Sequence, residues 1–272
     1  MQNRILTLGA AVAMLAAGLC SCSEKETEVA TYENNYEQTL VQDDSASVQI
    51  SHSIQYYKSY EGGRALRNKI NDAIVRSCFG EEYAGLTAEE ASDAVSDTLI
   101  ANYQKDAGQS YDEYLAYSKD NGNDYDWTPA TFCNWYYRTV GAFGEKFMNL
   151  QTYQVFSESY TGGAHGMYYS IPYIIDIKNG EIVTENDLFQ PGYVAPVTGL
   201  IKEELESEQG SDTFETMFQD GMVPNGKCGV SLEGVTWFYQ PYEIASYAEG
   251  IIKVTVPWAE LKPYLNSEYI KL

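Results

Sequence analysis

The hydrophobic pattern of this chain changes at Phe132, and that change constrains the fold more than any other feature. Beyond it, apolar and polar residues tend to alternate with the period of two that is typical of strands. Residues 150–160 and 168–177 are aromatic and β-branched runs. Lys178-Asn179-Gly180-Glu181 separates the second run from residues 182–184, and Asn-Gly in such a position is a strong hairpin signal. This part of the chain therefore predicts antiparallel strands.

Helical signals are stronger before Phe132. Residues 47–56 alternate as a strand, and His52 lies on the otherwise apolar face of that strand, where we interpret it as packed or at an edge. Helical spacing follows from Leu66 to Ser77 and again over residues 91–102. Thr87-Ala88-Glu89-Glu90 fits a capping box at the start of the second helix. A third helix is predicted over residues 111–118.

The last third of the chain adds elements of both kinds. A helix is predicted across residues 194–217, strands over 230–239 and 251–256, and a closing helix whose first turn contains Pro257. Hairpins beside segregated helices predict an α+β fold, with helices packed on a mostly antiparallel sheet. We expect two intimately associated subdomains, residues 45–150 and 151–272.

The first 21 residues resemble a bacterial lipoprotein signal peptide. A short basic start is followed by an apolar segment, from Ile5 to Leu19, that is too short to span a membrane. Leu19-Cys20-Ser21-Cys22 resembles a lipobox, which would make Cys22 the lipidated residue. Residues 22–44 are polar and acidic without apolar periodicity, so they predict a disordered tether. These features predict a lipid-anchored protein of the cell envelope, in the outer membrane and facing either the periplasm or the surface.

The chain is strongly acidic. It has 17 Lys and Arg against 39 Asp and Glu, and cleavage before Cys22 would remove only Arg4, changing the net charge from −22 to −23. Such a charge repels nucleic acid and attracts basic partners, although solubility in the envelope is the simpler explanation of it.

Three cysteines remain beyond the lipobox: Cys78, Cys133 and Cys228. An oxidising compartment permits one disulfide among them, and the sequence does not indicate which pair would form it. Their wide spacing, without a CxxC motif, argues against zinc binding and a redox motif.

The segment Tyr160-Thr161-Gly162-Gly163-Ala164-His165-Gly166 is the part of the chain that most resembles a site. Three glycines give the backbone freedom, and His165 is one of only two histidines. We interpret this segment primarily as a turn between strands. The candidate binding-face or turn residues are Tyr160, Gly162, Gly163, His165, Gly166, Tyr242, Glu243 and Tyr247.

Catalytic motifs are missing from the sequence. It has no HExxH, and Gly229-Val230-Ser231-Leu232-Glu233 lacks the final glycine of a nucleophile elbow. Cysteine catalysis would need Cys133 or Cys228 beside His165. We therefore assign no catalytic residue, no metal site and no cofactor. A glycan-cleaving enzyme that uses His165 or carboxylates remains the alternative, with the candidate acids Asp176, Glu181, Asp187 and Glu243.

Three segments together resemble a known family. They are residues 160–166, Gly180-Glu181 leading to Asp187-Leu188-Phe189, and residues 242–250 ahead of Val254-Thr255-Val256-Pro257-Trp258. Their order is similar to that in the extracytoplasmic RsiV-like domain of lysozyme-sensing anti-sigma factors, which also precedes the catalytic part of PdaC-like peptidoglycan deacetylases. The resemblance covers residues 155–268 and implies an α+β binding domain without catalytic residues to transfer.

The family resemblance and the charge together predict a non-enzymatic, lipid-anchored binding module. Its expected partner is a basic protein such as a lysozyme-like enzyme, or an envelope glycan, and not nucleic acid.

Overall fold

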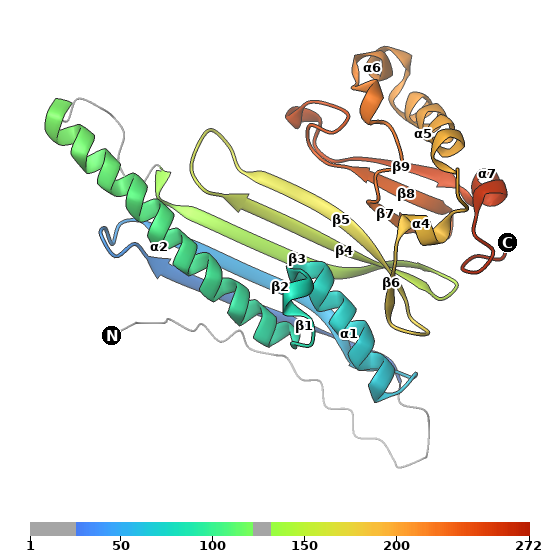
Figure 1. Ribbon diagram of the computed structural model, residues 1–272, viewed down its shortest axis with the longest axis horizontal. Helices are drawn as coiled ribbons and strands as arrows, with labels where there is room; N and C mark the ends of the chain where they lie inside the picture. Colours follow the sequence, from blue (N-terminus) through green and yellow to red (C-terminus); the bar gives the residue numbers. More distant parts are fainter. Residues whose placement is uncertain (1–25, 122–131) are drawn as a thin grey trace.

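The larger of two sheets organises the molecule (Figure 1). A computed structural model describes residues 26–121 and 132–272. The six strands lie in the order β1-β2-β3-β4-β5-β6, and every neighbouring pair is antiparallel except β2 and β3. Their bounds are β1 Glu28–Thr39, β2 Ser47–Ser59, β3 Trp135–Phe147, β4 Leu150–Tyr160, β5 Met167–Asp176 and β6 Glu181–Val183.

Among the described residues between β2 and β3, two long helices cover one face of this sheet. They are α1, Arg64–Phe79, and α2, Ala88–Asn121. Parallel neighbours need such a crossover, because a tight turn can join only antiparallel strands. The capping box at the start of α2 forms as predicted: Thr87 N donates to the Glu90 carboxylate at 2.9 Å, and Glu90 N donates to Thr87 Oγ1 at 3.2 Å.

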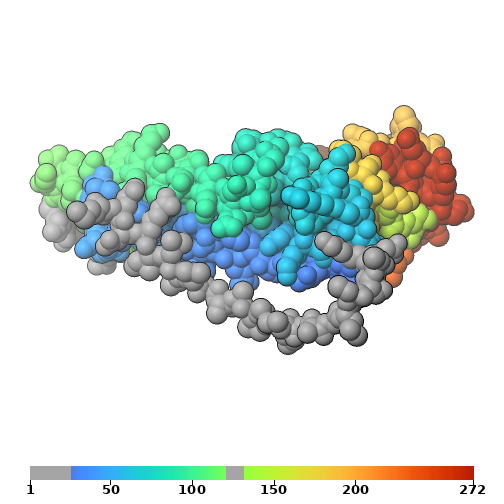
Figure 2. Space-filling view, turned by 90° about the horizontal axis from the view of Figure 1, so that it is seen from below, coloured from blue at the N-terminus to red at the C-terminus, as the bar shows by residue number. Residues whose placement is uncertain are grey.

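The C-terminal part of the chain lies at one end of the molecule (Figure 2), and it contains a smaller antiparallel sheet. Trp237 is fully buried in the core beneath this sheet. Thr152 of β4 joins the two sheets: its hydroxyl is 2.8 Å from both the N–H and the carbonyl of Val230. The elements of this part are α4 Glu185–Leu188, α5 Val194–Gln209, α6 Ser211–Thr216, β7 Cys228–Val230, β8 Gly234–Tyr239, β9 Ile252–Pro257 and α7 Trp258–Leu261. Short 3₁₀ turns span Glu81–Tyr83, Gln219–Gly221, Tyr247–Glu249 and Lys262–Tyr264.

The predicted fold class is confirmed: this is an α+β protein with a large, mostly antiparallel sheet. The Asn179-Gly180 hairpin also forms, and Gly180 has the positive φ of +79° that such a turn demands. His52 is buried on β2, as the alternation indicates.

The predicted tether over residues 22–44 is wrong for most of its length. Residues 28–39 form β1, which pairs with β2 along almost its whole length. Its half-buried inward positions alternate with exposed ones that include Glu33 and Glu37, and several of the inward positions carry polar or tyrosine side chains such as Asn34 and Tyr36. Backbone pairing with β2, rather than burial of apolar side chains, holds this segment in place. Its amino-acid composition can therefore be as polar as that of a disordered chain. The predicted signal peptide, residues 1–21, and Cys22 lie outside the described residues.

Three further expectations need correction. The predicted boundary between residues 150 and 151 falls at the start of β4, which pairs with β3 in one continuous sheet. The helices predicted over 91–102 and 111–118 are parts of the single helix α2. Cys78, Cys133 and Cys228 are free thiols, because each lies in or against a different hydrophobic cluster.

Candidate functional site

Two loops from distant parts of the sequence meet at one end of the large sheet. The β4–β5 loop, residues 161–166, contacts the β8–β9 loop, residues 240–251. Four rings gather there, and we call them the aromatic loop cluster: His165, Tyr168, Tyr242 and Tyr247. Tyr247 is central, since its ring stacks on His165 at 4.3 Å between centroids and lies 5.5 Å from Tyr168 and 5.7 Å from Tyr242.

Glycines allow the β4–β5 loop to turn tightly enough for this contact. Gly162 has φ +91°, and a Cβ there would lie 2.9 Å from the carbonyl oxygen of Phe132. A Cβ on Gly166 would lie 2.7 Å from the carbonyl oxygen of Ser159. Both are closer than real Cβ contacts allow, so side chains are excluded at these positions.

Hydrogen bonds then fix the loop. The Tyr160 hydroxyl donates to the carbonyl of Gly163 at 2.9 Å. The carbonyl of Gly166 accepts from the Tyr247 hydroxyl at 2.9 Å and from His165 Nδ1 at 2.8 Å. The ring of His165 is therefore oriented by its own backbone and by Tyr247, in agreement with the interpretation of the segment as a pinned turn.

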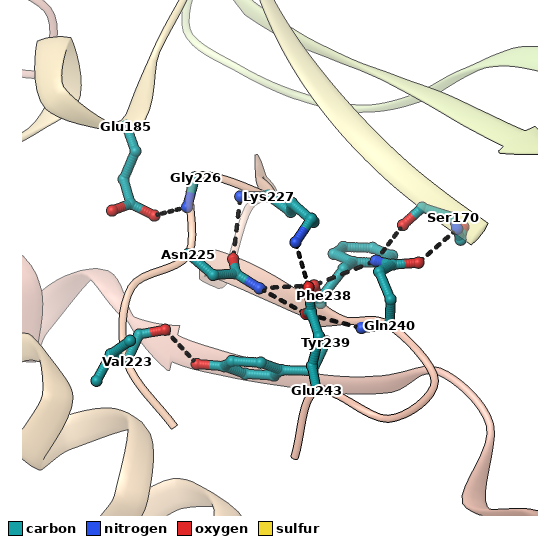
Figure 3. Close-up of polar contacts among 10 residues, drawn as sticks. All are labelled: Ser170, Glu185, Val223, Asn225, Gly226, Lys227, Phe238, Tyr239, Gln240 and Glu243. Atoms are coloured by element: carbon teal, nitrogen blue, oxygen red, sulfur yellow. Dashed lines mark hydrogen bonds and ion pairs between the residues drawn. The ribbon is translucent and has the colours of Figure 1, made fainter. Parts of the chain in front are cut away.

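A separate polar network holds the β8–β9 loop (Figure 3). The Glu243 carboxylate accepts from the backbone N–H of Gln240 at 2.9 Å and from Asn225 at 3.2 Å, and it forms an ion pair with Lys227. Gln240 in turn accepts from the N–H of Ser170 on β5 at 2.8 Å. The network ties the loop to the large sheet.

The same network decides the roles of two candidate residues. Glu243 points into the loop and neutralises Lys227, so its charge serves the loop's conformation rather than an outward face. Tyr242, one position earlier, has φ +71° and is 54% exposed. A tyrosine in the left-handed region is uncommon and strained, and such residues cluster at functional sites.

Sequence reasoning missed one residue that supports this region. The Glu185 carboxylate is buried in the core beneath the smaller sheet and accepts three hydrogen bonds. The donors are the Tyr193 hydroxyl at 2.6 Å, Trp237 Nε1 at 2.7 Å and the backbone N–H of Gly226 at 3.1 Å. A buried charge is tolerated when it is this fully hydrogen-bonded. Thr184-Glu185-Asn186-Asp187 forms a capping box, which was the available signal for a helix start here.

Acidic groups lie beside the aromatic loop cluster. Tyr136 stacks near Tyr160, with 6.1 Å between ring centroids, and donates to the Glu158 carboxylate at 3.0 Å. The pKa of Tyr247 is raised above its usual value, first by burial and then by neighbours that include Tyr168, Tyr242 and Glu158. The Tyr247 phenol therefore stays protonated and neutral at physiological pH.

The described geometry does not assemble a cysteine nucleophile. Burial raises the pKa of the Cys78 thiol to about 12 and that of Cys133 to about 11, and it raises the pKa of Cys228 strongly as well. Thiols of this kind are not the thiolates that cysteine catalysis requires. Among residues 26–121 and 132–272, no group of three His, Cys, Asp or Glu side chains is placed to hold a metal ion.

Two further candidate carboxylates of the alternative enzyme hypothesis, Asp176 and Asp187, have local structural roles. Asp176 accepts from Asn149 at 2.7 Å and from the N–H of Lys178 at 2.9 Å, which stabilises the β5–β6 turn. Asp187 accepts from the N–H and the hydroxyl of Thr184 at 2.8 and 2.6 Å.

In the described part of the chain, none of the helices is both long and apolar enough to span a membrane.

These features define an α+β protein in which two packed sheets present an aromatic surface on two loops. Residues 186–259 match the family model described as a protein of unknown function, DUF3298. The matched segment includes α5, the small sheet and the β8–β9 loop. It is the part of the chain that supplies Tyr242 and Tyr247.

Solved structures support the fold over most of the chain. A DUF3298 family member from Bacteroides fragilis is similar, with a TM-score of 0.76 and 20% sequence identity, over 89% of this chain and 95% of that one. A DUF3298 family protein from Pseudomonas aeruginosa has a TM-score of 0.54 and 13% identity, over 89% and 96%. No curated protein matches the chain.

Proposed function

We propose that this protein is a non-enzymatic binding module of the cell envelope, anchored by a lipid on Cys22. Its partner is a basic protein of the lysozyme-like kind, whose lysine and arginine side chains contact the aromatic loop cluster. The resemblance of residues 160–166 and 242–250 to RsiV-like domains supports this proposal. The signal-like residues 1–21 support the envelope location.

The observation that carries the proposal is the meeting of the two motifs in one exposed cluster. Tyrosine faces attract ammonium and guanidinium groups, each contact contributing roughly 0.5–2 kcal/mol. The Tyr247 ring is held by its hydrogen bond to Gly166 and its stack on His165, and the Tyr242 ring packs 5.7 Å from it, so little conformational entropy is lost when a partner binds. Rigid aromatic anchors of this kind are typical hot spots of protein interfaces.

Electrostatic attraction adds a second, longer-ranged contribution to the binding of a basic partner. Glu158 lies next to the cluster, Glu249 is exposed on the β8–β9 loop, and the whole chain has a net charge of −22. Opposite charge accelerates encounter with a basic partner and weakens as salt rises. Binding should therefore depend on both the aromatic rings and the ionic strength.

Isothermal titration calorimetry of the protein with lysozyme, at low and at moderate salt, tests this. Tyr242→Ala should weaken binding by about tenfold or more, as hot-spot truncations do. Tyr117→Ala, which removes a ring that is 50% exposed on α2, is the matched control and should leave the affinity unchanged. If lysozyme produces no heat at either salt concentration, a basic protein of this kind is not the partner.

Purified sacculi provide the complementary test. Retention of the protein on sacculi that Tyr242→Ala abolishes would identify a glycan as the ligand instead. Release of glycan fragments that is lost in a folded His165→Ala variant would establish the enzyme hypothesis and contradict the binding-module proposal.

A further inference from the structure

A large cleft lies far from the aromatic loop cluster, between α1, the start of α2 and the strands β1 and β2. Its volume is about 990 Å³, within the range of small-molecule sites. We call it the α1 cleft. The residues that matter most for its chemistry are Tyr32, Tyr57, Arg64, Arg67, Lys69 and Leu86.

The α1 cleft concentrates positive charge on a strongly negative protein. Lys58, Arg64, Arg67 and Lys69 all line it, although the whole chain has only 17 Lys and Arg. Lys58 is paired with Glu28 at 2.9 Å. For the other three, no carboxylate of the described residues lies within ion-pair distance. Within the described residues, these three cations therefore share one concave surface without an ion-pair partner.

Arg67 is the one of the three whose side chain is held by hydrogen bonds. Its guanidinium donates to the carbonyl of Lys58 at 2.9 Å and to the Asn68 side chain at 2.9 and 3.3 Å. All these acceptors are neutral, so they position the half-buried side chain without neutralising it. A planar guanidinium held in this way is well suited to bind a carboxylate or phosphate.

The acids that line the cleft do not cancel this charge. Asp72 accepts from Arg76 at 3.0 Å and from the N–H of Gly85 at 2.6 Å, so it is already engaged. Glu89 is exposed in the first turn of α2, where the helix dipole stabilises a carboxylate. Helix α1 begins at Arg64 with no acid in its first turn and no side-chain cap, which adds partial positive charge at the same edge.

The rest of the cleft is suited to an apolar group. Tyr32, Tyr57 and Leu86 contribute rings and an aliphatic side chain to its lining. Asn71 holds this wall in place through two bonds to the backbone of Tyr57, at 2.9 and 2.8 Å. Apolar surface with a few fixed polar groups is the usual composition of a ligand site.

We propose that the α1 cleft binds a small amphipathic anion, with a phosphate or carboxylate group at Arg64, Arg67 and Lys69 and an apolar body against the tyrosines. The anion is either dissolved or the headgroup of a lipid, since both present the same chemistry. The site is independent of the aromatic loop cluster, so it stands whether or not that cluster binds a basic protein.

Calorimetry with octyl phosphate tests the proposal, with octyltrimethylammonium as the probe of opposite charge. Octyl phosphate should bind one to one and more weakly as salt rises, and the cationic probe should not bind. Arg67→Gln should weaken octyl phosphate by about tenfold or more, because a charged hydrogen bond is lost. Lys105→Gln makes the same charge change at a side chain that is 80% exposed on α2 and should have no effect.

A second variant separates a loss of binding from a loss of folding. Lys69 is exposed, and its side chain forms no hydrogen bond or ion pair with the described residues, so Lys69→Gln should keep the thermal midpoint and still weaken octyl phosphate severalfold. Sedimentation with phosphatidylglycerol vesicles distinguishes the two sources, since only a headgroup site retains the protein on them. Equal binding of both probes, or unchanged affinity in both variants, would overturn the proposal.

Discussion

Acidification should weaken the contact between α2 and β2, because His52 is buried there as a neutral ring. The side chain is 3% exposed, its Nε2 lies 3.1 Å from the Ser96 hydroxyl, and no partner contacts its Nδ1 in the described residues. The rings of Phe79 and His52 pack in a T-shaped arrangement, with 5.2 Å between their centroids. A proton on this ring would place a charge among apolar neighbours without a second acceptor.

The magnitude follows from the pKa. Burial lowers the pKa of His52 to about 4 from the ordinary 6.5, and the carboxylate of Asp93 only partly offsets this. Between these values the unfolded chain binds a proton that the folded chain does not, so stability rises with pH there and falls on acidification. A shift of about 2.5 units corresponds to roughly 3 kcal/mol of unfolding free energy, lost between about pH 7 and pH 4.

Urea unfolding of the wild type and of His52→Gln across this pH range measures the effect. Carboxylates titrate in both proteins, so the difference in unfolding free energy isolates His52. The wild type should lose about 3 kcal/mol relative to the variant as pH falls from 7 to 4. His165→Gln is the control and should behave as the wild type, because its ring is exposed.

Nuclear magnetic resonance gives a direct check. The chain has only two histidines, so His165→Gln leaves a single imidazole to titrate. A pKa near 6.5 for that ring, or a stability difference that does not change with pH, would refute the reasoning.

Three other predictions concern packing. Gly141→Ala should lower the unfolding free energy by about 1–3 kcal/mol, because its Cβ would lie 2.8 Å from the sulfur of Cys78. Gly144→Ala is the control, and it should change the unfolding free energy little because the nearest contact of its Cβ would be at 3.4 Å. Thr152→Val should cost about 1–3 kcal/mol in the same assay, since it leaves the N–H of Val230 buried without its partner. The three thiols beyond the lipobox should be alkylated only after denaturation, as mapped by mass spectrometry, and alkylation of the native protein would show that they are accessible.

Local signals in the sequence predicted local structure well. The alternation over residues 47–56, the capping box at Thr87 and the Asn179-Gly180 turn are each decided within a few residues, and each forms. β1 was missed because its stability comes from pairing with β2, which no periodicity within residues 28–39 reveals.

The candidate site was only partly predictable for the same reason. Two segments could be singled out by composition, but the stacking of His165 on Tyr247 joins residues 82 positions apart and depends on how the two sheets pack. The inward direction of Glu243 was equally hidden, since it depends on Lys227 and Asn225 in another loop. Neither contact produces a recognisable pattern in the local sequence.

The start of β1 has a consequence for how the protein would stand on a membrane. Only five residues lie between Cys22 and Glu28, which reach about 20 Å at most. Glu28 pairs with Ser59 at one end of β2, whereas Tyr160 pairs with Tyr136, which is level with Gln49. The ten residues from Gln49 to Ser59 correspond to roughly 33 Å of strand. With a lipid on Cys22, the sheet would act as a stiff spacer that holds the aromatic rings clear of the headgroups and turns the α1 cleft toward them.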